Sequence, residues 1–430
     1  MYSLLTMRWE LKYVVFLIFA LAVEVKGSIK VCKKYSDFYI SGSKDCWRNN
    51  YDVLDVSGIA RTWGFKTENY SLILDDGYII TVFRVYNEIT QNTPIVLGHG
   101  SLTNPLSWVF AGNNSLPYVL GNRGYDVWMV SFRGTAYSKG HVSLSPTDHK
   151  YWQFTFHQMG IYDVKSTLDL VHNTTNKKAI YIGYSMGTTN SYVYCSMLPD
   201  HCKQRLLGVI SYAPVGYLLD AKGVLPILWQ PFIWPIVKGL TYTFFGGEFL
   251  KVTPAYQFLT KIVSASPLAN YGVAFLVGLF EGIHLNTLDP SYIPVVIYRW
   301  LDSIGIEVYT HFAQVCVGKN FSQFDYGKLG NIEHYAQEYP PAYPISDISV
   351  PVAMFVGRND YLATLTSSSK FYDTLNSTSQ CGYAILEDSK WSHYDFAIAK
   401  TLPILHRPTF DRIKDMEQGK CNASLLISEQ

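Results

Sequence analysis

A short apolar run that ends in a glycine-flanked serine constrains the fold of this chain more than any other stretch. Residues 179–182 are apolar and lead directly into residues 183–187, whose order Gly-Tyr-Ser-Met-Gly fits the pattern G-x-S-x-G. In this pattern a strand turns sharply into a helix, and the glycines leave room for close packing. Such a pattern also arises by chance, so its context decides. Ser185 is the candidate nucleophile, at the positive end of the following helix.

Apolar runs on both sides of this turn alternate with segments of helical periodicity. An amphipathic helix is expected where Ile161, Val164, Leu168 and Val171 recur at helical spacing. A hairpin is expected at 65–84, around the turn at Asp75-Asp76-Gly77. Buried strands are expected at 95–97, 127–130, 179–182, 207–212, 352–356 and 383–386. This order predicts an α/β fold with a mainly parallel central sheet and helices on both faces.

The stretch from Pro214 to about Tyr339 interrupts that order. It is rich in Trp, Phe, Leu and Pro and has no short strand-like runs, with helical candidates at 271–280 and 295–304. We interpret it as an inserted, mainly helical cap with a lid. The expected division is a signal peptide at 1–27, the first part of the core at 28–213, the cap at 214–339 and the second part of the core at 340–430.

The N-terminus has the features of a secretory signal. Arg8 and Lys12 precede an apolar run at 13–22 that is too short to span a bilayer. Residues 20–22 resemble a cleavage site, and a cut after Gly27 is also possible. No later segment offers a clean transmembrane span. Secretion is supported by N-glycosylation sequons at Asn69, Asn113, Asn173, Asn320, Asn376 and Asn422. We expect an extracellular protein, with the lysosome as the alternative.

Cysteine usage and charge narrow the classes of partner. Seven cysteines in an oxidising compartment leave at least one unpaired, and Cys32 with Cys46 and Cys195 with Cys202 are the favoured local pairs, although spacing does not fix connectivity. No C-x-x-C motif occurs, so no metal or other cofactor is expected. A net charge of +1 does not favour nucleic acid as a partner. The oligomeric state is not indicated.

A serine hydroxyl needs a base, and that base needs an acid that orients it. In α/β-hydrolases the chain order is Ser, then Asp or Glu, then His, each on a loop after a strand. Asp360 follows the expected strand at 352–356, and His393 follows the one at 383–386. An isolated acid is more often a turn residue and an isolated His a loop residue, but here their order fits. The sequence predicts a triad of Ser185, Asp360 and His393.

Acyl transfer also needs donors for the oxyanion. One is expected from the amide of Met186, after the nucleophile, and the other from the loop that follows the strand at 95–97. In that loop we assign the Ser101 amide, with Leu102 next in line. His99 is expected to be structural.

Ordered motifs give the chain a resemblance to the secreted and lysosomal acid lipase family, which includes gastric lipase, lysosomal acid lipase and many insect lipases. It covers about 64–398. In that family these motifs imply hydrolysis of neutral lipid esters by a Ser-Asp-His triad under a helical cap with a lid. The motifs lie at 76–78, 99–100, 124–128, 133–134, 137–138, 144–146, 162–163, 183–189, 213–215, 324–327, Tyr335, Gln337, 340–341, 359–360, His393 and 395–396.

The chain departs from the family pattern around the expected site. Tyr184 and Met186 stand where the family usually has His and Gln, and Ser101 stands where Leu is usual. The family's small-residue stretch before His311 has become residues 302–306, Asp-Ser-Ile-Gly-Ile. Backbone donors do not depend on these side chains, so catalysis should survive, while acyl-chain preference and pH optimum are left open.

Three functions fit the sequence. The first is a secreted lipase acting on acylglycerols or sterol esters at a lipid–water surface. The second is a lipid-binding or storage protein without turnover, and the third is a hydrolase of soluble esters. Aromatic residues of the cap favour lipid, and Leu102, Trp229 and Trp234 are the candidate substrate contacts.

Secretion is testable on protein recovered from expressing cells. The mature chain should begin near Val23 or Ser28 and carry N-linked glycan, so glycosidase treatment should increase its electrophoretic mobility. An unglycosylated chain that still bears Met1 would contradict this expectation.

Overall fold

The computed structural model describes residues 29–299 and 301–421, so the expected signal peptide and the Asn422 sequon lie outside the described part. Nine strands form the central sheet. In spatial order they are β13 (Gln380–Ile385), β12 (Val352–Val356), β9 (Leu206–Tyr212), β8 (Ala179–Tyr184), β5 (Pro94–Gly98), β6 (Asp126–Ser131), β4 (Tyr78–Tyr86) and β3 (Lys66–Ile73), with β7 (Gly140–His141) paired to β4. Neighbours from β13 to β6 are parallel, and β4 joins β6, β3 and β7 antiparallel.

The apolar runs of the sequence form strands because the sheet is covered on both faces. β5, β6, β8 and β12 are buried along their whole length, which requires continuous rather than alternating apolar residues. Residues of β9 contact helices on both faces of the sheet. Tyr192 of α6 (Met186–Met197) donates a hydrogen bond to Ser211 Oγ at 2.7 Å, whereas Met416 of α17 (His406–Gln418) packs against Gly208. Odd and even residues of a strand point to opposite faces.

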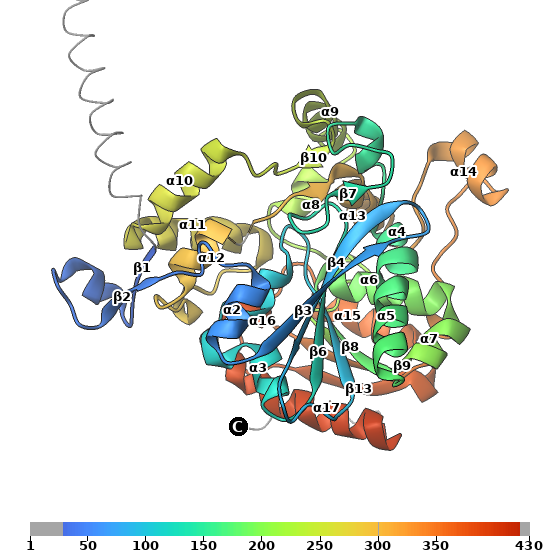
Figure 1. The fold of residues 1–430 in the computed structure, drawn as a ribbon. Helices are drawn as coiled ribbons and strands as arrows, with labels where there is room; N and C mark the ends of the chain where they lie inside the picture. Colours follow the sequence, from blue (N-terminus) through green and yellow to red (C-terminus); the bar gives the residue numbers. More distant parts are fainter. Residues whose placement is uncertain (1–28, 300, 422–430) are drawn as a thin grey trace, which may run out of the picture.

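Helices therefore form two layers around the sheet (Figure 1). α5 (Lys165–Thr175), α6 and α7 (Pro199–Arg205) lie on one side, and α3 (Leu116–Gly121) and α17 on the other. The expected amphipathic helix is α5 with a π-helical segment, Met159–Val164, before it. The remaining core helices are α2 (Val56–Thr62), α4 (Phe156–Gln158), α15 (Leu365–Thr374) and α16 (Asp395–Ile398).

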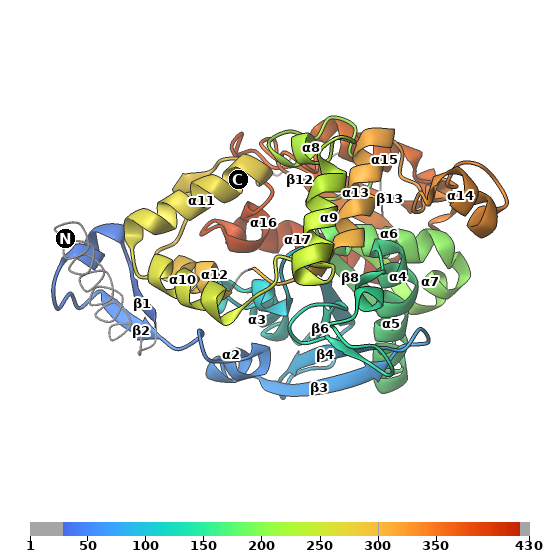
Figure 2. The ribbon, with the colours of Figure 1, turned by 90° about the horizontal axis from the view of Figure 1, so that it is seen from above.

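Segment 214–339 is mainly helical. Its helices are α8 (Leu225–Leu228), α9 (Trp234–Phe245), α10 (Pro254–Ser264), α11 (Pro267–Glu281), α12 (Ile293–Arg299), α13 (Ile306–Gly318) and α14 (Gly327–Tyr335). Seen from above, α8 to α13 spread across one end of the sheet, with α14 set apart at the side (Figure 2). Within the described ranges no single helix is long and apolar enough to cross a membrane; α10 and α11 would pass that test only as a pair, and they are bent by 116°.

The prediction of a helix at 295–304 is wrong about where the helix ends. α12 stops at Arg299, and Ile304 belongs to the two-residue strand β11 (Ile304–Gly305), which pairs with β10 (Glu248–Phe249). The buried carboxylate of Asp302 explains why the helix does not continue. It accepts hydrogen bonds from Asn104 Nδ2 at 2.8 Å and from the amide of Ala136 at 2.9 Å. These bonds hold the chain to loops of the core instead of continuing the helix.

The first described residues form a separate hairpin beside the cap helices. β1 (Ile29–Cys32) and β2 (Cys46–Asn49) make a two-stranded sheet of their own. The Cys32 amide donates to Pro290 O at 3.3 Å, and the Tyr35 ring lies 4.5 Å from that of Tyr271 in α11. Residues 29–49, grouped with the core in the sequence-based division, thus pack against segment 214–339.

Three disulfides are present. Both favoured local pairs are confirmed, Cys32–Cys46 and Cys195–Cys202. The third, Cys381–Cys421, joins β13 to the residues that follow α17, and the remaining Cys316 is buried and unpaired.

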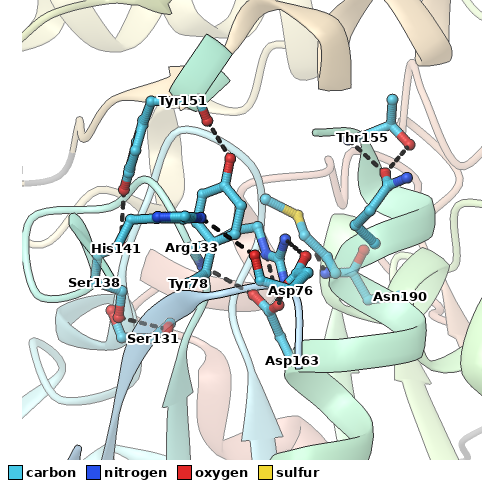
Figure 3. A network of polar contacts seen from close by, with 12 residues as sticks. Asp76, Tyr78, Ser131, Arg133, Ser138, His141, Tyr151, Thr155, Asp163 and Asn190 are labelled. Carbon is cyan, nitrogen blue, oxygen red and sulfur yellow. Dashed lines mark hydrogen bonds and ion pairs between the residues drawn. The ribbon is translucent and has the colours of Figure 1, made fainter. Parts of the chain in front are cut away.

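A fully buried arginine ties three parts of the core together (Figure 3). Arg133, in the loop after β6, binds Asp163 of the π-helical segment through Nε at 2.7 Å and through its own amide at 2.9 Å. It also binds both carboxylate oxygens of Asp76 in the β3–β4 turn, and its guanidinium lies 4.2 Å from the centre of the Tyr78 ring. Burial raises the pKa of Asp163 to about 6, although Arg133 acts in the opposite direction. The carboxylates are therefore tolerated because the arginine is there.

Replacing this arginine should destabilise the protein strongly. Arg133→Met leaves Asp163 buried without its partner, and breaking such a pair costs about 3–5 kcal/mol of the free energy of unfolding. Urea denaturation followed by tryptophan fluorescence measures the loss. Lys66→Met, which breaks the exposed ion pair with Glu88, is the control and should leave the midpoint unchanged. Equal midpoints for the two variants would contradict the assigned role.

Candidate active site

Ser185 sits at a strained turn between β8 and α6. Its backbone has φ 54° and ψ −120°, a conformation that residues other than glycine rarely adopt. The flanking glycines have no room for a side chain. A Cβ on Gly183 would lie 2.8 Å from the backbone of Gly187, and a Cβ on Gly187 would lie 2.2 Å from Gly98 O in β5. The tight turn thus depends on α6 approaching β5 directly.

The structure brings the three predicted triad side chains together. Ser185 Oγ lies 2.7 Å from His393 Nε2, and His393 Nδ1 lies 2.8 Å from Asp360 Oδ2. Asp360 Oδ1 also accepts the amides of Leu362 at 2.9 Å and Ala363 at 2.7 Å, which fix the carboxylate after β12. All three side chains are buried. This arrangement can pass the serine proton to the imidazole while Asp360 holds the ring in place.

The electrostatics of the site raise the pKa of the His393 imidazole, which makes it a stronger base. Burial alone lowers the pKa of His393, but the carboxylates of Asp360 and Glu281 raise it, and the net pKa lies above 6.5. The Tyr184 ring lies 5.5 Å from the imidazole and also fills the space beside Gly100, where a Cβ would come within 2.8 Å of it. Tyr184 therefore packs against both His393 and the loop after β5.

The expected oxyanion donors flank Ser185. Met186 is the first residue of α6, so its amide has no acceptor within that helix. His99 holds the other loop, because its Nδ1 lies 2.8 Å from Gly100 O and its Nε2 accepts the Phe132 amide at 3.1 Å. Burial lowers the pKa of His99 to about 4, so this histidine stays neutral. Ser101 follows and lines the same cavity as Ser185. The assignment of both amides remains a prediction.

A mostly apolar cavity opens on Ser185. Of the predicted substrate contacts, Trp229 lines it. Trp234 is buried behind Tyr309, to which its ring stacks at 6.4 Å, and its Nε1 donates to Thr310 Oγ1 at 3.1 Å. Leu102 is only partly buried and is not among the lining residues. The lining comprises Ser101, Ser185, Val215, Leu218, Leu225, Trp229, Tyr309, Phe312 and Leu362.

Sequence reasoning did not single out Glu281 or most of the residues that line the cavity. Tyr309 and Phe312 of α13 line the cavity, and the peptide oxygen of Glu281 accepts the His393 amide at 3.0 Å. The α13 residues have no distinctive sequence pattern. Glu281 did carry a signal, because it is the one charged residue of the mostly apolar α11.

The five sequons within the described ranges are all solvent-exposed. Asn69, Asn113, Asn173, Asn320 and Asn376 have the accessibility that glycan attachment requires. Their glycosylation stays a prediction.

Comparisons with known proteins agree with this fold. Residues 93–253 match the family model described as alpha/beta hydrolase fold, and residues 56–112 match that of a partial alpha/beta-hydrolase lipase region. Mouse gastric triacylglycerol lipase is 30% identical over 72% of this chain and 80% of its own length. Lysosomal acid lipase/cholesteryl ester hydrolase of Macaca fascicularis is 28% identical over 83% of this chain and 89% of its own length.

A solved structure of a candidate lipase from Sulfolobus solfataricus is similar in fold alone. It covers 82% of this chain and 94% of its own, with a TM-score of 0.51 at 12% identity.

Proposed function

Since the chain belongs to the acid lipase family of α/β-hydrolases and is accordingly a lipase, a carboxylic ester hydrolase, we propose that it cleaves acylglycerols or sterol esters through an acyl-enzyme on Ser185. The observation that carries this proposal is the continuous hydrogen-bonded chain from Ser185 through His393 to Asp360, buried beneath an apolar cavity. The named relatives act on triacylglycerols and on cholesteryl esters, which supports both substrate classes.

The proposed reaction has two steps. In the first, Ser185 Oγ attacks the ester carbonyl carbon and gives its proton to His393 Nε2, while the amides of Met186 and Ser101 bind the oxyanion. The tetrahedral intermediate collapses, the carbon–oxygen bond of the ester breaks, and His393 returns the proton to the leaving alcohol. In the second step, water attacks the acyl-enzyme with His393 as base. The carboxylic acid leaves and the Ser185 hydroxyl is restored.

Apolar surface on segment 214–339 supports action at a lipid–water surface. Large exposed apolar side chains usually mark a binding site when they gather on one part of a protein. In the proposed function this segment roofs the cavity, contributes the acyl-chain groove through Trp229, and opens at lipid. Side chains of this kind on α9, α10 and α11 are Ile236, Leu240, Phe244, Phe245, Phe258, Leu259, Leu268, Tyr271, Phe275 and Leu276.

The two alternative functions differ from this one in testable ways. A binding or storage protein without turnover is disfavoured because each member of the hydrogen-bonded chain is present. A hydrolase of soluble esters would need no roof of exposed apolar side chains. For the compartment, three disulfides fit an oxidising environment, and we propose the extracellular space.

The lipid substrate is tested with an emulsified long-chain triacylglycerol and a soluble short-chain ester. Trp229→Ala removes an apolar wall of the cavity, so activity on the emulsion should fall about 10-fold or more, since burying a large apolar side chain contributes about 1.5–3 kcal/mol. Activity on the short ester should change less, because a short chain needs less of that wall. Activity on a long-chain ester should also rise sharply once the substrate exceeds its solubility.

Trp63→Ala is the matched control, because Trp63 is 41% exposed and binds Tyr51 away from the cavity. It should leave both activities near those of the unmodified protein. Equal losses on both substrates in Trp229→Ala would contradict the assigned groove, and turnover of the soluble ester alone would favour the esterase.

A further inference from the structure

One carboxyl group beside the proposed triad has no part in the mechanism above. Glu281 ends α11, and although the residue is partly exposed, its Oε2 atom is buried and has no hydrogen-bond partner among the residues that the structure describes. A buried carboxylate oxygen without a donor is costly. Packing alone therefore gives no reason for an acidic residue at this position.

The end of α11 is fixed against both loops that carry the triad. A Cβ on Gly282 would lie 2.0 Å from Asn359 O, so this residue touches the backbone next to Asp360. Asn359 Nδ2 in turn donates to Ile283 O at 3.0 Å. On the other loop, the amide of His393 donates to Glu281 O at 3.0 Å. The backbone at the end of α11, from which the Glu281 side chain projects, is thus held by close contacts to both loops.

Among the described residues, His393 is the one group around this carboxyl that favours its ionised form. Asp395 is already satisfied, because His284 Nδ1 lies 2.7 Å from it and the Ser392 amide donates to it at 2.7 Å. Burial raises the pKa of Glu281 to about 7, His393 opposes that rise, and Asp360 and Asp395 add to it. The titratable groups that interact electrostatically with the Glu281 carboxyl are His393, Asp360, Asp395, Tyr184, Tyr309 and Tyr394.

We propose that Glu281 is a positioning residue that acts through His393 and sets the acid limit of the reaction. The inference rests on the proposed function, because it needs His393 to be the base. An ionised Glu281 stabilises the imidazolium that forms when Ser185 attacks, which favours the reaction at neutral pH. The same charge makes His393 accept a proton too early as the pH falls.

A neutral side chain at this position should move the pH profile in a direction that a structural role would not. In Glu281→Gln the imidazole loses its second carboxylate, so the acid limb of kcat/KM should shift about one unit to lower pH. The rate on the alkaline plateau should fall by up to about 10-fold, because the imidazolium loses the same stabilisation. The measurement is kcat/KM from pH 4 to pH 9. The substrate is a soluble short-chain ester, so the profile does not include effects of pH on a lipid surface.

Three further variants make the outcome decisive. Glu281→Ala removes the charge without introducing an amide group and should shift the limb in the same direction. This variant keeps the test valid if Glu281→Gln does not fold. Glu281→Asp keeps a carboxylate and should retain a limb close to that of the unmodified protein. Glu307→Gln, on α13 and paired with Lys238 and Tyr242, is the control and should not shift it.

Profiles of Glu281→Gln and Glu281→Ala that superimpose on that of the unmodified protein would overturn the inference. A failure of the proposed function is recognised separately, because Ser185→Ala would then retain turnover of the same ester.

Discussion

The close approach of α6 to β5 is the constraint on which the rest of the structure depends. Gly187 lies so near Gly98 that no side chain fits between them, and this contact forces Ser185 into a backbone conformation with positive φ. The strain is held by β8 itself and by its neighbour β5, which are both buried along their whole length. As a result the chain leaves β8 at Ser185, and the serine oxygen faces His393. The proposed reaction depends on that orientation.

A second constraint joins the inserted segment to the chemistry. α11 ends against the loops of Asp360 and His393, while Tyr309 and Trp229 enclose the cavity from other parts of the same segment. Movement of the roof as one piece would disturb the imidazole, because His393 donates its amide to Glu281 O. We therefore infer that any opening at lipid involves α8 to α10 rather than the end of α11.

The parts predictable from the sequence were those fixed by local patterns. Central strands such as β8 are recognisable because burial on both faces demands an unbroken apolar run, and the elbow because its glycines have one steric solution. Cys195–Cys202 is close in sequence, whereas Cys381–Cys421 spans 40 residues and needed the fold to be seen. The end of α12, the burial of Trp234 behind Tyr309 and the placement of Glu281 all depend on contacts between distant segments, which periodicity does not encode.

The central claim is that Ser185 carries the acyl group during turnover. Acid quenching within milliseconds of mixing with a short-chain ester, followed by proteolysis and mass spectrometry, measures this directly. We predict that the peptide containing Ser185 gains the mass of the acyl group during turnover and that Ser185→Ala shows neither the adduct nor the turnover. An acyl group on a different residue, or full turnover in Ser185→Ala, would contradict the claim.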